Sequence, residues 1–297
     1  MQNQIQLYNR RTGSMETESV YGRKWMDFFY GNTLGRRITG LALARRPLSV
    51  FYGYLQNRSR SRCKIGPFIT QCGIDMNQVV VPPGGFPSFN AFFIRRLKPG
   101  ARPVDPDPHR FVAPADSRLL VLDPDPHEPI AVKGIHVTLP GLLGLSQSGP
   151  LFEGGTVLVF RLAPCDYHRF GHVADGVQGP LHSVSGGFHS VNPLALQHKP
   201  DILMTNFRQW CFVHSPLWGT MIQAEVGAMM VGSIVQQKPL GGPCGKGDEK
   251  GYFQFGGSTI VLVVEPGRIR VDDDIRQHSR QGIETLVRYG EGVGSLI

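Results

Sequence analysis

The chain has 297 residues, of which 41% are hydrophobic, and its formal net charge is +8. The apolar fraction is ordinary, and 37 Gly and 23 Pro follow no fixed period, which excludes a disordered chain, a collagen and a coiled coil. No uncharged apolar run approaches the roughly 20 residues of a membrane-spanning helix, and the N-terminus lacks the apolar segment of a secretory signal. Five scattered cysteines argue against a disulfide framework and favour a reducing compartment.

The positive charge lies at the N-terminus. Residues 1–64 carry twelve Lys and Arg against three acidic residues, and the rest of the chain carries nineteen against twenty. Apolar residues alternate with arginines, especially over 34–56, which predicts an amphipathic helix. Such a segment suits the surface of an anionic membrane and equally a helical cap on the core. A nucleic-acid partner is not expected, because no recognised nucleic-acid-binding pattern accompanies the basic residues.

After residue 64 the chain changes to short β-rich segments separated by Pro and Gly. A short helix is expected at 88–97, and strands are expected at 119–122, 155–162, 221–226, 229–235, 252–255, 259–264 and 285–288. This pattern indicates an α+β fold rather than a doubly wound sheet. We expect two parts: a basic, amphipathic helical region over 1–64 that faces a membrane, and a mostly antiparallel β domain over 65–297.

The segment 246–268 reads KGDEKGYFQFGGSTIVLVVEPGR. Two β-type runs flank Gly256 and Gly257, which predicts a hairpin with a two-residue turn, and in that case Ser258 simply begins the return strand. The Ser258 hydroxyl can also attack the carbonyl of Gly257. The resulting ester can open by β-elimination, and loss of ammonia then leaves a pyruvoyl group. This chemistry needs a base and donors for the oxyanion.

Candidate residues for this machinery lie upstream. Asp116 follows a Pro turn, and His168 and His172 follow an apolar run, so the order Asp, His, Ser matches one order of charge-relay triads. Each residue also has a plain structural explanation, as a turn residue or a core histidine. The two histidines have a metal-ligand spacing, but no Glu completes the motif and Gly171 disfavours a helix, so no metal is predicted.

The chain as a whole resembles the phosphatidylserine decarboxylase proenzyme family, whose members cleave themselves at a Gly-Ser bond. The matching stretches are FNAFFIRRLKPGARPVD (89–105), VAPADSR (112–118), VKGIHVTLPGLLG (132–144), FRLAPCDYHRFGHVADG (160–176), HSVNPLAL (189–196), VGAMMVGSI (226–234) and KGDEKGYFQFGGSTIVLVVEPGRI (246–269). The resemblance implies cleavage between Gly257 and Ser258 into a β chain (1–257) and an α chain (258–297). It also implies that phosphatidylserine is decarboxylated to phosphatidylethanolamine through a Schiff base on a pyruvoyl group derived from Ser258, without metal or pyridoxal phosphate.

The resemblance also suggests roles for individual residues. The self-cleaving triad falls on Asp116, a histidine of the segment 166–172, and Ser258. The family usually has a second histidine three positions after the first, where this chain has Gly171, so His172 and His168 both remain candidates for the base. His168 matches the family's decarboxylation histidine. Ser190 and Asn192 match the part that meets the headgroup phosphate; a turn before Pro193 explains them equally well.

The implied partners are phosphatidylserine and an anionic phospholipid membrane, and the implied assembly is a heterodimer of the chain's own α and β chains, with further self-association left open. The implied location is peripheral, on the cytoplasmic face of a bacterial membrane. Two rival interpretations remain: an uncleaved serine hydrolase that uses the same three residue types, and a non-enzymatic lipid-binding homologue.

Overall fold

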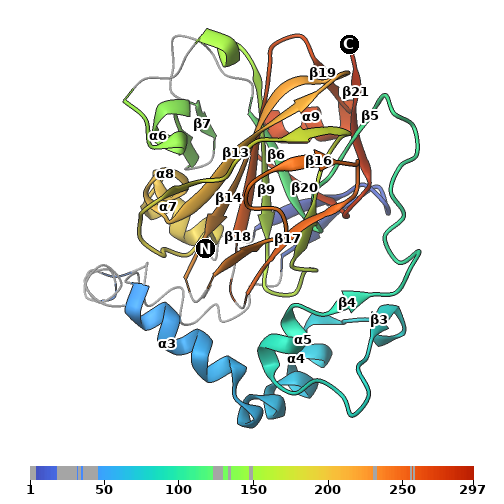
Figure 1. Cartoon of the computed structure of the whole chain (residues 1–297), viewed down its shortest axis with the longest axis vertical. Helices are drawn as coiled ribbons and strands as arrows, with labels where there is room; N and C mark the ends of the chain where they lie inside the picture. Colours follow the sequence, from blue (N-terminus) through green and yellow to red (C-terminus); the bar gives the residue numbers. More distant parts are fainter. Residues whose placement is uncertain are drawn as a thin grey trace.

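The structure is a computed structural model that describes residues 5–18, 32, 35, 46–122, 130–132, 135–146, 150–229, 233–254, 256 and 258–297. Its largest element within these ranges is an eleven-stranded, mostly antiparallel sheet (Figure 1). In hydrogen-bonded order its strands are β16 (Gly242–Cys244), β11 (Gly176–Gln178), β13 (Arg208–Ser215), β14 (Gly219–Gly227), β18 (Ser258–Val264), β9 (Thr156–Leu162), β6 (Ser117–Leu122), β20 (Glu284–Val287), β1 (Gln6–Asn9) and β2 (Ser14–Thr17), with β12 (His182–Val184) pairing with β13.

Smaller sheets and short helices complete the fold. The smaller sheets are β10 (Arg169–Gly171), β17 (Glu249–Phe253) and β15 (Ile234–Gln236); β19 (Ile269–Val271), β21 (Gly292–Leu296) and β5 (Arg110–Val112); β3 (Val79–Val80) with β4 (Arg96–Leu97); and β7 (Ile130–Val132) with β8 (Ile135–Val137). The helices are α3 (Arg46–Asn57), α4 (Ile65–Cys72), α5 (Phe89–Phe93), α6 (Leu139–Leu143), α7 (Pro193–His198), α8 (Ile202–Thr205) and α9 (Asp273–Arg280), with 3-10 turns η2 (Ser59–Lys64), η3 (Met76–Gln78) and η4 (Pro150–Phe152).

The large sheet is buried on both faces. Along β18, Ile260 and Leu262 pack into one core together with the two three-stranded sheets, while Val261 and Val263 pack into a second core beneath α6, α7 and α8. This alternation explains why β18 reads as a continuous apolar run, since neither of its faces meets water. The predicted α+β class with a mostly antiparallel core agrees with this architecture.

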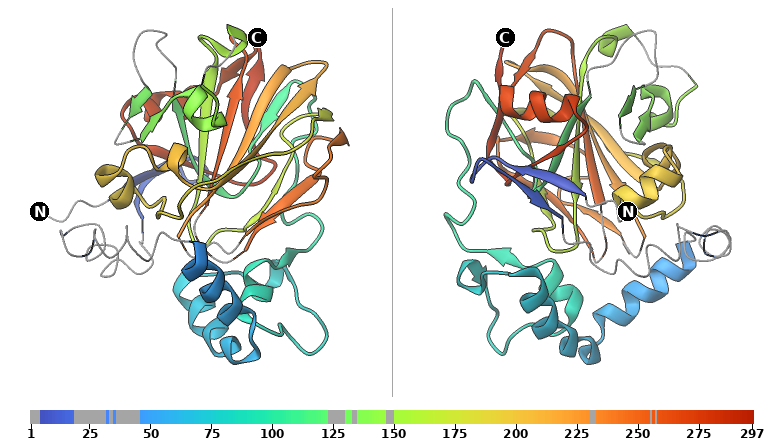
Figure 2. Two further views of the ribbon diagram at one scale, coloured as in Figure 1. Left: turned by 60° about the vertical axis from the view of Figure 1, so that its left-hand side comes forward. Right: turned by 180° about the vertical axis from the view of Figure 1, so that it is seen from behind.

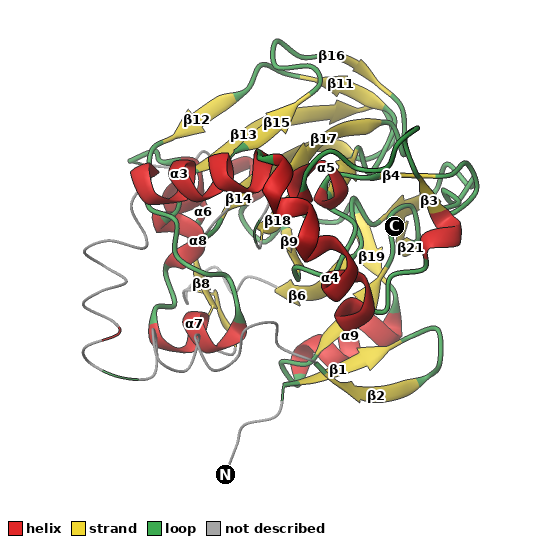
Figure 3. Cartoon of the chain, turned by 90° about the horizontal axis from the view of Figure 1, so that it is seen from below, coloured by secondary structure: helices red, strands yellow, loops and turns green. Residues whose placement is uncertain are grey.

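A third core belongs to the helical region. Phenylalanines of α4 and α5 fill it, with Phe92 and Phe93 fully buried. Helices α3, α4 and α5 gather at one end of the molecule, below the sheet in Figure 1 and in both views of Figure 2. Seen from that end, α3 and α4 lie across the ends of the strands (Figure 3). The end of the sheet that meets these helices is the end at which Ser258 begins β18.

The expectation of a helical N-terminus is wrong for residues 6–17. β1 pairs in parallel with β20 at the edge of the large sheet, and β2 pairs with β1. Arg10, in the turn between them, forms ion pairs with Asp272 and Asp274, so part of the N-terminal charge neutralises C-terminal acids. The helical region also continues past residue 64 into α4 and α5. Of the predicted segment 34–56, residues 34 and 36–45 lie outside the described residues, and α3 covers the part from Arg46 onward.

The predicted strands at 119–122, 155–162, 221–226, 259–264 and 285–288 correspond to β6, β9, β14, β18 and β20, with ends that shift by one or two residues. The predicted helix at 88–97 is shorter, because α5 ends at Phe93 and Arg96–Leu97 form β4. The predicted hairpin is wrong. β17 pairs with β10 and β15, and β18 pairs with β14 and β9, so Gly256 lies on a connection between two sheets.

The structure also corrects the cysteine prediction, because Cys72 and Cys165 form a disulfide. The two residues are 93 positions apart, so their spacing gave no signal, and the fold brings the end of α4 beside the loop that follows β9. The remaining cysteines are Cys63, which is exposed, and Cys211 and Cys244, which are buried.

Candidate active site

Ser258 is the first residue of the central strand β18, and its side chain is fully buried. In the sheet register it lies opposite Gly227 on β14 and Leu162 on β9. Its hydroxyl has no hydrogen-bond partner among the described residues. A buried polar group without a partner is uncommon in native proteins and marks a position that a structural role does not explain. Gly257, the predicted scissile residue, lies outside the described residues.

His168 lies on the loop after β9, close to the Ser258–Leu162 pair. Its Nε2 is 3.1 Å from the carbonyl oxygen of Ala163, the residue that follows Leu162. Because a carbonyl oxygen only accepts hydrogen bonds, Nε2 carries the proton and Nδ1 keeps a lone pair. Among the described residues Nδ1 has no partner. Burial, and next the positive charge of Arg95, lower the pKa of His168 to about 3, so the ring is neutral near pH 7.

The helical region shields this histidine. The ring of Phe93, at the end of α5, stacks on the His168 ring with centroids 4.1 Å apart. On the same loop, Asp166 accepts a hydrogen bond from the Ala163 N–H and forms an ion pair with Arg118 of β6. These contacts fix the loop between α5 and the sheet, and they keep water away from the His168 ring, which is fully buried.

His172 lies elsewhere along the sheet. Its N–H donates to the Asp248 carbonyl, and the preceding Gly171 carbonyl accepts from Gln223, which is opposite Leu262 in the register. Leu262 is four residues beyond Ser258, a separation of about 13 Å along a strand. The His168 carbonyl instead accepts from Phe253, at the other end of β17. Burial, and next the charge of Lys250, lower the pKa of His172 to about 4.

Asp116 immediately precedes β6 and does not contact either histidine through a described hydrogen bond. Its carboxylate accepts hydrogen bonds from Arg102, at 2.8 Å to Nε and 2.6 Å to Nη2, and from the Tyr289 N–H at 2.9 Å. β9 lies between β6 and β18, so about 10 Å separates the two strands. The structure therefore brings Asp116 to the same end of the sheet as Ser258, but it pairs the carboxylate with an arginine.

Tyr289 explains the glycine at position 171. A Cβ atom built on Gly171 would lie 2.2 Å from the Tyr289 hydroxyl oxygen, closer than real side chains approach. That hydroxyl donates to the Gly247 carbonyl at 2.9 Å, and burial raises the pKa of Tyr289. The phenol thus fills the space into which a residue-171 side chain would project. Sequence reasoning missed Tyr289, because 118 positions separate it from Gly171.

Ser190 and Asn192 lie on the loop before α7, and Ser190 accepts a hydrogen bond from the Asn192 N–H. The side chain of Asn206 connects this loop to the central strands, since its amide donates both to the His189 carbonyl and to the Gly227 carbonyl. Gly227 is the register partner of Ser258. The loop predicted to meet the headgroup phosphate therefore lies one strand away from the predicted cleavage site.

A buried ion pair joins β17 to β14. Lys250 Nζ lies 2.8 Å from Glu225 Oε1 and 3.1 Å from Gln236 Oε1, and the side chains of the pair are 1% and 0% exposed. β17 precedes the predicted cleavage site, and β14 is the neighbour of β18. The ion pair therefore holds the strand before the predicted site against the sheet that contains the strand after it.

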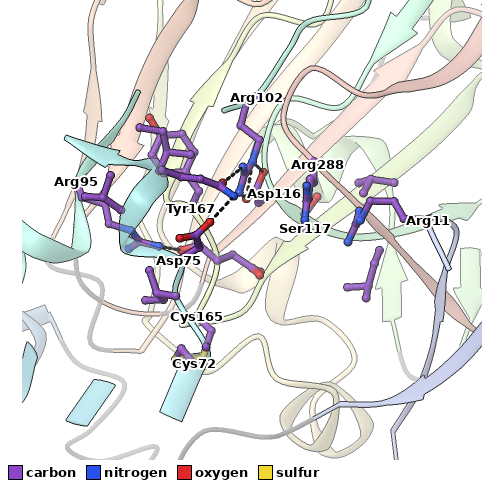
Figure 4. A pocket seen from close by; sticks show the side chains of 18 residues that line it. Arg11, Cys72, Asp75, Arg95, Arg102, Asp116, Ser117, Cys165, Tyr167 and Arg288 are labelled. Atoms are coloured by element: carbon purple, nitrogen blue, oxygen red, sulfur yellow. Dashed lines mark hydrogen bonds and ion pairs between the residues drawn. A yellow bond between two sulfur atoms is a disulfide. The ribbon is translucent and has the colours of Figure 1, made fainter. Parts of the chain in front are cut away.

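A cavity of about 240 Å³ opens beside Asp116, between α4, β4 and the edge of the large sheet (Figure 4). Its lining includes Arg95, Arg102, Arg288 and Tyr167, and the Cys72–Cys165 disulfide forms part of its wall. The sequence did not single out these arginines, because it does not show which of the many arginines line a cavity. No helix among the described residues is both long and apolar enough to cross a bilayer.

Comparison with known proteins gives a consistent result. The family model described as phosphatidylserine decarboxylase matches residues 89–295. A protein of Desulfitobacterium hafniense (strain Y51) named phosphatidylserine decarboxylase proenzyme is 38% identical over 291 residues, which cover 98% of each chain. A protein of the same name from Clostridium botulinum (strain Eklund 17B / Type B) is 38% identical over 294 residues, which cover 99% of each chain.

Proposed function

The chain belongs to the phosphatidylserine decarboxylase family, and on that premise we propose that it cleaves itself between Gly257 and Ser258 and then converts phosphatidylserine to phosphatidylethanolamine and CO₂. The observation that carries the proposal is the Ser258 hydroxyl, which is fully buried and without a described partner at the start of a central strand. A hydrolase that uses Ser258 directly is a poorer fit, since Ser258 begins a β-strand rather than a strand-to-helix turn and the chain contains no GxSxG motif.

We propose His168, rather than His172, as the base for self-cleavage. Nδ1 of His168 has a lone pair without a partner among the described residues. The ring is hydrogen-bonded to the Ala163 carbonyl, and Ala163 follows Leu162, the register partner of Ser258. His168 takes the Ser258 hydroxyl proton as Oγ attacks the Gly257 carbonyl carbon, and returns it to the amine of residue 258 when the C–N bond breaks. In this proposal Asp116 does not orient a histidine. Its carboxylate instead positions Arg102 and the backbone N–H of Tyr289 by accepting their hydrogen bonds.

Ser258 fits the precursor of a pyruvoyl group, because it begins β18 and its hydroxyl makes no hydrogen bond to the described residues. A pyruvoyl carbonyl there supplies an electron sink for decarboxylation. The chain's own contribution is a dry, neutral imidazole next to position 258, with Phe93 stacked on it. Ser190 and Asn192, on the loop tied to Gly227, would orient the headgroup. With a pKa of about 3, His168 holds a proton on Nε2 only, so it can donate to the product carbon only after it has accepted a proton on Nδ1.

The proposed attachment to an anionic membrane surface uses α3. Phe51, Tyr54 and Leu55 on this helix are 57%, 52% and 41% exposed. Exposed basic residues follow directly in the chain, namely Arg58, Arg60, Arg62 and Lys64. An apolar helix face beside a basic cluster is the composition expected of a segment that lies on an anionic bilayer. Flotation with anionic but not with neutral vesicles tests this attachment, and equal flotation with both would contradict it.

The experiment for self-cleavage is a denaturing gel combined with the intact mass of the small fragment. The wild-type chain should yield 1–257 and a 258–297 fragment with a blocked N-terminus. Ser258→Ala should fold but remain one chain, whereas Ser183→Ala, an exposed strand serine, should be processed normally. His168→Ala should block processing and His172→Gln should not. Cleavage of the Ser258→Ala chain would refute the assignment of Ser258, and normal processing of His168→Ala would remove His168 from the role of base.

A further inference from the structure

The cavity beside Asp116 contains a buried arginine that has no hydrogen-bonded carboxylate partner among the described residues, although the charges of Asp116 and Asp166 act on it. Four arginines line it: Arg11, Arg95, Arg102 and Arg288. Arg102 is paired with Asp116, and Arg11 lies 3.6 Å from Glu291. Figure 4 shows Arg95 reaching in from one side of this cavity, while Arg11 and Arg288 lie on the other.

Arg95 is the arginine that is both buried and unpaired. The residue is 5% exposed, and its Nε and Nη1 have no hydrogen-bond partner in the described part of the chain. Its Nη2 reaches the Asp166 carbonyl at the long distance of 3.5 Å, and its guanidinium lies over the Phe92 ring, 5.1 Å from the centroid. Burying a guanidinium whose N–H groups lack hydrogen-bond acceptors is unfavourable. A site that keeps such a group unpaired in its empty state is suited to an anionic ligand.

The position of Arg95 relates this anion site to the reaction centre. Arg95 follows Phe93, which stacks on His168, by two residues. Its charge is also the second-largest cause, after burial, of the lowered pKa of His168. An anion bound at Arg95 would therefore lie close to the imidazole proposed to serve position 258.

We propose that Arg95 supplies the charged contact to the phosphodiester group of the substrate headgroup, for which Ser190 and Asn192 offer only uncharged groups, an inference that rests on the proposed function. The planar fork of a guanidinium matches two oxygens of a phosphodiester. The headgroup carboxylate is the poorer candidate, because it loses its charge as it leaves as CO₂. A cation bound to the carboxylate would stabilise the reactant more than the transition state and would slow the reaction. The phosphodiester keeps its charge throughout, so Arg95 can bind it without that penalty.

The kinetic test uses processed enzyme and phosphatidylserine in mixed micelles. Arg95→Gln should be cleaved normally, and its KM should rise about ten- to a hundredfold, the effect of losing a charge-assisted pair, while kcat stays within about threefold. Arg96→Gln is the matched control, because Arg96 is the adjacent residue and is exposed; it should leave both constants unchanged. An unchanged KM in Arg95→Gln, or a loss confined to kcat, would overturn the assignment.

A binding measurement separates this inference from the proposed function, because it needs no turnover. The full-length Ser258→Ala chain is titrated with glycerophosphoethanolamine, and the Arg95→Gln change should weaken binding by a similar factor. Inorganic phosphate is the second probe, and equal affinity for both would indicate a site for free anions and contradict the headgroup assignment. If the wild-type enzyme releases no CO₂ but the titration behaves as expected, the proposed function fails while the anion site stands.

Discussion

Mild acid should destabilise this protein through its buried histidines. The pKa values of His168 and His172 are lowered to about 3 and about 4, first by burial, against about 6.5 in an unfolded chain. Between pH 6.5 and pH 4 the unfolded chain therefore binds protons that the folded chain does not. Stability contributed by the neutral rings is present above pH 6.5 and is lost as the pH falls.

The size of the effect follows from the shifts. From pH 7.0 to pH 5.5 each histidine should lower the free energy of unfolding by about 1.3 kcal/mol, so the pair should lower it by about 2.5 kcal/mol. Urea unfolding at the two pH values measures this difference, and the Ser258→Ala background keeps the protein as one chain. Most carboxylates titrate below this window.

Non-titrating variants assign the loss to its source. His168→Asn and His172→Asn should each reduce the pH-dependent difference by about 1.3 kcal/mol, whereas His182→Asn, a change at an exposed histidine on β12, should leave it in place. Equal stability at pH 7.0 and pH 5.5 in the unmutated histidine background would refute the claim that both rings are buried and neutral.

Two further changes test contacts around the site. Lys250→Met should lower the free energy of unfolding by about 3–5 kcal/mol, because it leaves the Glu225 carboxylate buried without its partner. In urea unfolding, the double variant Lys250→Met, Glu225→Leu should recover most of this loss. A loss below about 1 kcal/mol in the single variant would contradict the prediction. Gly171→Ala should lower the free energy of unfolding by about 1–3 kcal/mol, since the new methyl group meets the Tyr289 hydroxyl. Adding Tyr289→Phe should restore part of that loss in thermal melts. A Gly171→Ala variant as stable as the wild type would show that the two residues are not in contact.

Several strands of the large sheet could be predicted because their own residues are mostly apolar and β-branched. β9 and β18 are long, mostly apolar and β-branched runs, which strands buried on both faces of a sheet typically have. β1 and β2 were missed because QLYN and SMET are short and polar, and they are held by pairing with β20 and by the ion pairs of Arg10. The Gly-Gly segment predicted a turn but could not show that the strands on either side belong to different sheets.

The sequence singled out candidate residues, several of which the fold brings to one end of the sheet, but it could not give their arrangement. Ser258, Asp116 and His168 do come to one end of the sheet, whereas only the register showed that His172 lies about four residues further along. Arg95 stands out because it is buried without a hydrogen-bond partner for two of its nitrogens, and Tyr289 because its hydroxyl fills the space next to Gly171. Both properties depend on the folded structure, so the sequence could not show them. The Cys72–Cys165 bond was missed for the same reason.

The place of β18 within the sheet has a consequence for the life of the molecule. Residues 258–264 are hydrogen-bonded on both sides to strands that precede the predicted cut, and the later strands β20 and β21 pair with β6 and β5, which also precede it. Under the proposed cleavage, the two fragments would therefore share one sheet and could not separate without unfolding it. A copy whose pyruvoyl group had been destroyed could not exchange its 258–297 fragment for an intact one, so it would have to be replaced by newly synthesised protein.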